Sequence, residues 1–251
     1  MQLQDIKKYS AIGAGFIALY LIFLISSAPA DKLITQVPLP KGVSLQGISG
    51  SVFSGKARTV TINKYTVNNI EWSVSLLSLL TFDPSITINF GDRLGSVSGS
   101  MDLSNLGPEI LIENAQIIVD ANEIVTQLNL PIDLNAGGQI KLNVASYGMG
   151  KPVCAVANGI ILWDNANVNA MDEDIDLGSL QASLSCNKGA LEVTVDPKND
   201  LGLELTANAY SMKRVTADGY LTPGDKFPHA LRPVLGFIGK KDSKGRYTIR
   251  L

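Results

Sequence analysis

Alternation of apolar and polar residues dominates the chain after residue 40. Apolar side chains recur at every second position, with Thr, Ser, Asn or a charged residue between them. A period of two turns one side of a strand toward a core and the other toward solvent, as in antiparallel sheets. The clearest runs are Val60–Ile62, Ile86–Phe90, Ile140–Val144, Leu191–Val195 and Leu201–Leu205.

Turn-forming residues separate these runs at short and fairly even intervals. Such spacing predicts a mainly β fold of antiparallel sheets, either a sandwich or an elongated, twisted or curved sheet. A soft boundary near Leu130-Pro131 predicts two similar β halves. The turns are Asp83-Pro84, Gly137-Gly138, Asn187-Lys188-Gly189, Asp196-Pro197 and Asp218-Gly219.

Helix is expected in few places. Val74–Leu80 is interpreted as a strand end or one helical turn, and Ile117–Leu128 as strand or helix. His229–Ile238 is apolar but interrupted by Pro233 and Gly236, which predicts a turn or a short helix.

The start of the chain has a different pattern. Residues 9–30 contain no charged side chain. Twenty helical residues rise about 30 Å, the thickness of the hydrocarbon core of a bilayer. Lys7 and Lys8 precede this segment, and positive charge favours the cytoplasmic side. We therefore expect residues 1–8 in the cytoplasm, 9–30 as a single transmembrane anchor and 31–251 outside the cytoplasmic membrane.

Two alternatives remain open for this leader. Ala28-Pro29-Ala30 resembles an A-x-A cleavage site, so the segment is either a removed signal peptide or a retained anchor, which its length favours. Both alternatives export the rest of the chain. Small residues four apart, Ala11/Gly15 and Ala14/Ala18, predict close approach of another membrane helix or are ordinary small residues facing lipid.

The composition excludes several classes of function. Lys and Arg total 21 and Asp and Glu total 23, so the formal net charge of −2 argues against nucleic-acid binding. One histidine and two cysteines leave few ligands for a transition metal. In an oxidising periplasm Cys154 and Cys186 most simply form a disulfide, because the C-x-x-C spacing of a redox pair is absent.

Two motif-like segments do not support a ligand. Gly50–Ala57 matches G-x-x-x-x-G-K, but Ala57 replaces the magnesium-binding Ser or Thr and a strand pattern follows, which argues against a nucleotide. Asp172, Asp174 and Asp176 have calcium-loop spacing, but Ser183 stands where a bidentate Glu belongs. We expect a solvated acidic loop there, and no metal or cofactor.

Catalysis is not predicted either. The chain has no G-x-S-x-G elbow around a serine. His229 is interpreted as a surface residue. A periplasmic hydrolase would require a cleft that joins His229 or paired carboxylates with perturbed pKa values.

Several stretches resemble the type II secretion system protein N family, also called general secretion pathway protein N. Pro40–Ala57 is similar to the pattern P-x-G-V-x-L-x-x-V-x-G-T-[LV]-W-x-G-x-A, with Ser51 in place of Thr and Phe53 in place of Trp. The other stretches are Ile70–Leu80, Gly159–Ala166 with Leu177–Leu180, and the tail Leu231–Gly236 with Tyr247–Leu251.

The resemblance implies structural and no catalytic roles for the motif residues. The glycines suit a strand–turn–strand in which backbones crowd or φ is positive. Trp72 and Trp163 are interpreted as core or sheet-face anchors, with an interface role as the alternative. The motif residues are Gly42, Val43, Leu45, Gly47, Gly50, Phe53, Gly55, Trp72 and Trp163.

The resemblance also implies a function. Such a protein is a single-pass inner-membrane component of the apparatus that exports folded periplasmic proteins from Gram-negative bacteria, and it acts as a scaffold for other components of that system. An AsmA-like protein that shields lipid or another apolar molecule is the alternative. A continuous open apolar groove would favour the handling of lipid, and a closed, filled sandwich would favour scaffolding.

Overall fold

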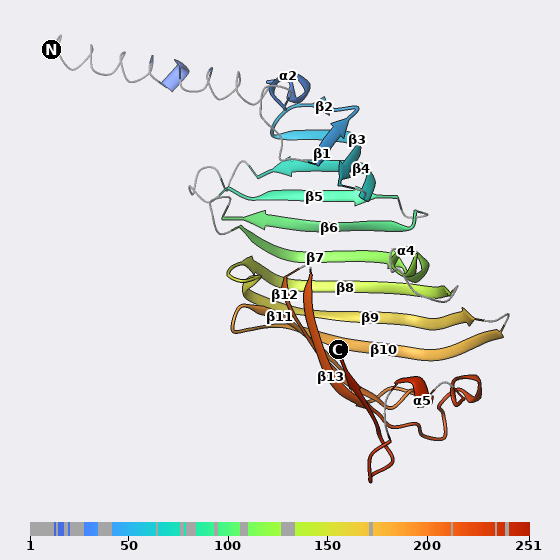
Figure 1. Cartoon of the computed structure of the whole chain (residues 1–251). Coiled ribbons are helices and arrows are strands. Elements are labelled where there is room, and N and C mark those ends of the chain that lie inside the picture. The colour runs from blue at the N-terminus through green and yellow to red at the C-terminus, as the bar shows by residue number, and fades with distance from the viewer. Residues whose placement is uncertain are drawn as a thin grey trace.

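The computed structural model describes residues 13, 15–17, 20, 28–34, 42–63, 65–75, 78, 84–92, 95–105, 110–126, 134–170, 173–211, 213–233, 235–238 and 241–251. Within them the chain forms one antiparallel sheet of 14 strands in which almost every strand pairs with its neighbours in sequence. The exception, β2, pairs with β3 beside the main path. Figure 1 shows the strands following one another from the β1 end of the sheet to β10, beyond which β11–β13 run steeply across this direction.

The strands lengthen toward the middle of the sheet. β8 to β10 are the longest, with 15, 17 and 15 residues. The strands are β1 (Val43–Gln46), β2 (Ser49–Gly50), β3 (Ser54–Ile62), β4 (Tyr65–Val74), β5 (Ile86–Gly91), β6 (Val97–Ser104), β7 (Leu111–Asp120), β8 (Asn135–Met149), β9 (Cys154–Ala170), β10 (Glu173–Asn187), β11 (Ala190–Val195), β12 (Leu203–Ser211), β13 (Arg214–Leu221) and β14 (Tyr247–Arg250).

The predicted mainly β fold is confirmed as an elongated sheet, and the alternative of a sandwich is wrong. The predicted boundary at Leu130-Pro131 lies outside the described residues. The sheet itself is continuous across it, because β7 pairs with β8 from Leu111↔Gly148 to Asp120↔Gln139. Two similar halves remain a prediction.

The described helices are short. α2 (Ala30–Ile34) precedes the sheet, and α4 (Ala121–Val125) follows β7, so the segment interpreted as strand or helix contains both. The 3₁₀ helix η1 (His229–Leu231) and α5 (Leu235–Ile238) occupy the segment predicted as a turn or short helix. The expected acidic loop is wrong where it is described, because Asp174 and Asp176 lie in β10.

Asparagines in the left-handed conformation interrupt the regular alternation inside several strands. Asn69, Asn114 and Asn165 have φ values of 50°, 50° and 49°. Asparagine tolerates this region better than other non-glycine residues. In β7 the kink at Asn114 keeps Ile112 and Ala115 in one apolar cluster although they are three residues apart. Each kink therefore shifts the sequence period without moving apolar residues to the other face.

Most of the buried residues lie in the C-terminal half of the sheet. One cluster joins Ala166 and Leu177 to Ala121 of α4, and Leu201 and Leu231 pack against it. A second cluster joins Val144, Ala157 and Leu184, with Leu191 and Val193 of β11 against them. A third consists of Leu221, Phe227 and Leu235 and is also contacted by Leu201 and Leu231.

The leader is only partly described. Among the described residues, no helix is long and apolar enough to cross a membrane. The predicted span of residues 9–30 lies mostly outside them, as do the packing candidates Ala11, Ala14 and Ala18. Gly15 is described as an exposed helical residue.

The predicted pairing of the two cysteines is confirmed. Cys154 begins β9 and Cys186 lies near the end of β10, and they form a disulfide with their Cα atoms 6.1 Å apart. Cys154 is almost fully buried, and Cys186 packs against the second apolar cluster. The bond therefore fixes the open ends of the longest hairpin, where β10 passes into β11.

Replacing Cys154 and Cys186 together by Ser is expected to lower the free energy of unfolding by roughly 3–4 kcal/mol, the chain-entropy value for a loop of this length. Thermal unfolding of the full chain with and without a reductant measures the effect. The reductant should lower the melting temperature of the parent and leave that of the double variant unchanged. Free thiols in exported protein, detected by mass spectrometry, would contradict the disulfide.

Candidate functional site

The cross-strand register aligns apolar residues on one side of the sheet. Trp72 of β4 stands opposite Ile88 of β5, which stands opposite Met101 of β6. We call this side the apolar face. From β3 to β10 it consists of Gly55, Ala57, Ile70, Trp72, Val74, Ile86, Ile88, Phe90, Val97, Gly99, Met101, Leu103, Ile112, Ala115, Ile117, Val119, Ile140, Leu142, Val144, Ala157, Ile161, Trp163, Leu180, Ala182 and Leu184.

The apolar face has an open section and a closed section. In the open section, from β3 to β7, only the small residues Ala57 and Ala115 are buried, and the other face residues are half-buried. In the closed section, from β8 to β10, Val144, Ala157 and Leu184 are buried under β11. The open section is therefore a layer of mostly half-buried apolar side chains, and Ala115 at its β7 end joins the buried cluster of the closed section.

The opposite face is mainly polar, with Ile118 and Ile160 exposed on it, and its polar side chains pair with one another. The Thr87 hydroxyl donates to Asp102 at 2.8 Å, and the Ser104 hydroxyl donates to Glu113 at 2.7 Å. Lys141 on β8 forms an ion pair with Asp164 on β9 at 3.0 Å. The hydrogen bond and charge of Lys141 hold the pKa of the Asp164 carboxyl below its usual value. Polar side chains thus satisfy one another across the strands, as expected of a solvated sheet face.

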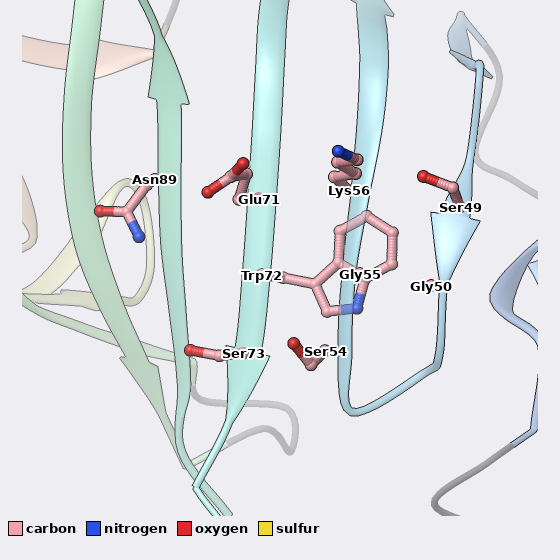
Figure 2. A pocket seen from close by; sticks show the side chains of 9 residues that line it. All are labelled: Ser49, Gly50, Ser54, Gly55, Lys56, Glu71, Trp72, Ser73 and Asn89. Carbon is pink, nitrogen blue, oxygen red and sulfur yellow. The ribbon is translucent and has the colours of Figure 1, made fainter.

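The family-like motif forms a hairpin at the N-terminal end of the apolar face. β2 and β3 pair through Ser49↔Lys56 and Gly50↔Gly55, and the Ser51 N–H donates to the Ser54 carbonyl at 2.8 Å. Gly50 has a φ of +89°. Figure 2 shows the Trp72 ring reaching from β4 across β3 at Gly55.

The absence of a side chain at Gly55 leaves room for the Trp72 ring. A Cβ atom on Gly55 would lie 2.4 Å from Cζ2 of Trp72 and 2.8 Å from the Ser51 carbonyl oxygen. The indole N–H of Trp72 donates to the Val52 carbonyl at 3.0 Å. The ring therefore locks β4 to the turn of the β2–β3 hairpin, and the adjacent pocket of about 350 Å³ is lined mainly by polar residues.

The other motif residues lie at bends or in strands. Gly42 and Gly47 have φ values of +85° and +67° and flank β1, which holds Val43 and Leu45. Phe53 is half-buried in the β2–β3 turn. Trp163 lies in the closed section, and its indole N–H donates to the Gly137 carbonyl at 3.0 Å. Both tryptophans thus bond a backbone carbonyl near a glycine-rich bend, but in different sections of the sheet.

The motif-like segments form no ligand site among the described residues. Gly55-Lys56 continues into β3 instead of opening a helix, and Lys56 is exposed opposite Glu71. His229 is exposed in η1. No group of His, Cys, Asp and Glu side chains that could hold a metal ion occurs in the described part of the chain.

Sequence reasoning considered an open apolar groove as the alternative but did not identify the residues that would form it. Each strand showed the alternation, but only the register shows that the apolar sides of successive strands coincide. The left-handed asparagines were also missed. Their signal was an apolar spacing of three where two is expected, as from Ile112 to Ala115.

Comparisons with known proteins agree with the resemblance in the sequence. A family model described as "Type II secretion system (T2SS), protein N" matches residues 41–250. The type II secretion system protein N of Aeromonas hydrophila is 28% identical over 97% of this chain and 98% of its own. Its namesakes in Vibrio cholerae and Klebsiella pneumoniae are 25% and 27% identical, over 96% and 97% of this chain and 96% and 95% of theirs. No solved structure gives a significant match.

Replacing Gly55 by Ala is expected to destabilise the hairpin by about 1–3 kcal/mol, because the added methyl overlaps Trp72 and two backbone carbonyls. Thermal unfolding and tryptophan fluorescence measure this loss. Gly224→Ala is the matched control, since a Cβ atom there has no neighbour within 4 Å. Equal melting temperatures for both variants would contradict the proposed locking of Trp72.

Proposed function

The chain belongs to the type II secretion system protein N family, and from this premise we propose that it is a non-catalytic, inner-membrane-anchored component of a type II secretion system, with its sheet in the periplasm. The observation that carries the proposal is the family match over residues 41–250 together with an uncharged segment before it. The disulfide supports an oxidising compartment for the sheet.

The proposed mechanism is local confinement. An anchor over residues 9–30 raises the effective concentration of the sheet near other inner-membrane and periplasmic components of the system. It needs neither nucleotide nor nucleic acid. The two ends of the strand order are β1 and β14. Lys241 forms a bridge with Tyr247 on the outer side of β14, so β1 is the more open edge within the described sheet. Such edges bind partner strands by β-augmentation.

In an antiparallel pair, hydrogen-bonded and non-hydrogen-bonded residue pairs alternate, and this alternation shows which backbone groups point outward at these edges. Asn63 N–H donates to the Gly42 carbonyl, so the intervening Val43 and Leu45 turn their backbone groups away from β3. Leu251 and Ala217 exchange hydrogen bonds of 2.9 and 3.1 Å, so Arg250 turns its backbone groups away from β13. The start of β14 is covered on that side by the Lys241–Tyr247 bridge, where the Asp242 N–H donates to the Arg246 carbonyl at 2.8 Å.

A second candidate function, shielding of an apolar molecule, is favoured by the open section of the apolar face. The half-buried side chains of this section keep part of their apolar surface accessible, and accessible apolar surface gathered on one side of a protein marks a site for a partner, a ligand or a membrane. This function is compatible with the first, because a secretion component can hold an apolar molecule while it is confined to the membrane.

Confinement predicts that the anchor is required. A variant in which residues 1–28 are replaced by a cleavable signal peptide is expected to fold, form its disulfide and fail to restore secretion in a deletion strain. Replacement of the same residues by an unrelated single-pass anchor is the control and should restore it. Crosslinking in intact cells identifies the components lost from the untethered form. Undiminished secretion by the untethered variant would contradict the mechanism.

Shielding predicts that charge on the open section abolishes function. Ile117→Lys places an ammonium group on the apolar face of β7, whereas Gln116→Lys places it on the exposed polar face of the same strand. We expect secretion to fall at least tenfold in the first variant and to remain at the parent level in the second. Blots of protein level and of the oxidised disulfide establish that both variants fold. Normal secretion by folded Ile117→Lys protein would contradict shielding. Scaffolding through the strand edges would then be the remaining proposed mechanism.

A further inference from the structure

We propose that the open section of the apolar face binds acyl chains of bilayer lipid, which enter at its β3 end and stop where the sheet closes at β8. The proposal rests on the second candidate function and names its ligand, its entrance and its limit. Three observations carry it: the chemistry of the face, the contact of the adjoining β2–β3 turn with the last residues of the predicted anchor, and the closure at β8–β10.

The face residues of the open section suit hydrocarbon. All of them are aliphatic or aromatic apart from Gly55, Gly99 and the thioether Met101, and none carries a charge. The backbone groups beneath them are already paired within the sheet. A peptide strand lying on this face would leave its own backbone groups without partners, which costs free energy, whereas an acyl chain has no such groups. The chemistry therefore favours lipid over an extended protein segment.

The entrance lies where the chain leaves the predicted anchor. The Val52 N–H donates to the Ala28 carbonyl at 3.3 Å, and Pro29 forms a β-bridge with Ser51. Figure 1 shows α2 beside β2 at this end of the sheet. If residues 9–30 cross the bilayer, these contacts hold the β2–β3 hairpin and Trp72 at the membrane surface.

From there the open section extends away from the membrane. Four strand spacings separate β3 from β7, and at 4.7–4.9 Å each they add up to about 19 Å. Half-buried apolar residues occupy the apolar face of β4 to β7, and β3 contributes Gly55 and the buried Ala57. An acyl chain that leaves the bilayer beside Trp72 therefore finds a continuous apolar surface at right angles to the strands.

The surface ends at β8 because two groups of residues cover the face beyond it. On one half, α4 and the residues Leu201, Ala230 and Leu231 cover Ala166, Val168 and Leu177. On the other half, β11 turns back so that Leu191 and Val193 cover Ala157 and Leu184. Phe227, which is only 2% exposed, packs with Leu221 of β13 and Leu235 of α5. This contact fixes the segment that contains η1 and α5 against β13. The structure thus describes a surface with a closed end.

Photo-crosslinking in intact cells tests the assignment. Benzoylphenylalanine is introduced into the full chain at Ile88 and at Ile117 on the open section, and at Gln116 on the polar face of the same strand as Ile117. After irradiation, mass spectrometry of the purified protein is expected to show adducts with the mass of membrane phospholipid at Ile88 and Ile117. The yield at Gln116 should be at least tenfold lower.

A further position tests the closed end. Val215 is 55% exposed on the apolar side of β13, beyond the covered strands, and a probe there disturbs no core residue. We expect no phospholipid adduct at Val215. An adduct there as abundant as at Ile88 would show that lipid passes the closed section and would overturn the limit at β8.

Other outcomes separate this proposal from the function on which it rests. Adducts of Ile88 with a protein, or with a second copy of the chain, would overturn the lipid assignment. If Ile117→Lys nevertheless abolishes secretion, shielding of an apolar partner stands and only its occupant changes. Equal lipid yields at Gln116 and Ile117 would show that the adducts come from nonspecific contact with the membrane. This result would also overturn the proposal.

Discussion

The backbone ladder between consecutive strands is the constraint on which the rest of the structure depends. Each backbone hydrogen bond contributes a net stabilisation of only about 1 kcal/mol. The register that these bonds set nevertheless decides which side chains share a face. Over β3–β7 the residues of the apolar face are mostly only partly buried, so at roughly 25 cal/mol per Å² of buried apolar surface they contribute less than they would under a complete cover. These strands therefore depend on pairing with β8, whose neighbours carry the buried clusters.

Strand positions could be predicted because alternation is a local property, as Ile86–Phe90 and Leu191–Val195 show. What covers the apolar side is not local. Alternation of apolar and polar residues indicates that one side of a strand avoids water. It is equally compatible with a side covered by a second sheet and with a side that no other element covers. The expected acidic loop failed for a related reason: Asp174 and Asp176 are tolerated in β10 because their exposed side points away from the buried Ile175 and Leu177.

The candidate site was predictable only in part. The resemblance identified Gly55 and Trp72 as motif residues, and strand propensity places both in or near strands. That the indole ring lies across Gly55 depends on pairing of β3 with β4, a register that neither residue encodes alone. The cysteine pairing was easier to predict, because the two cysteines of the chain allow a single intramolecular combination.

Scaffolding and shielding make different demands on the same sheet. Partners that bind at β1 or β14 need only the backbone groups of an edge, and the face between the edges could carry any residue. The closed section must be apolar because it is a core, but the open section supports no core on its uncovered side. Its aliphatic residues still line up over five strands, at a cost in solubility that polar residues would remove. An apolar occupant of the open section explains this composition, and attachment through the edges alone does not.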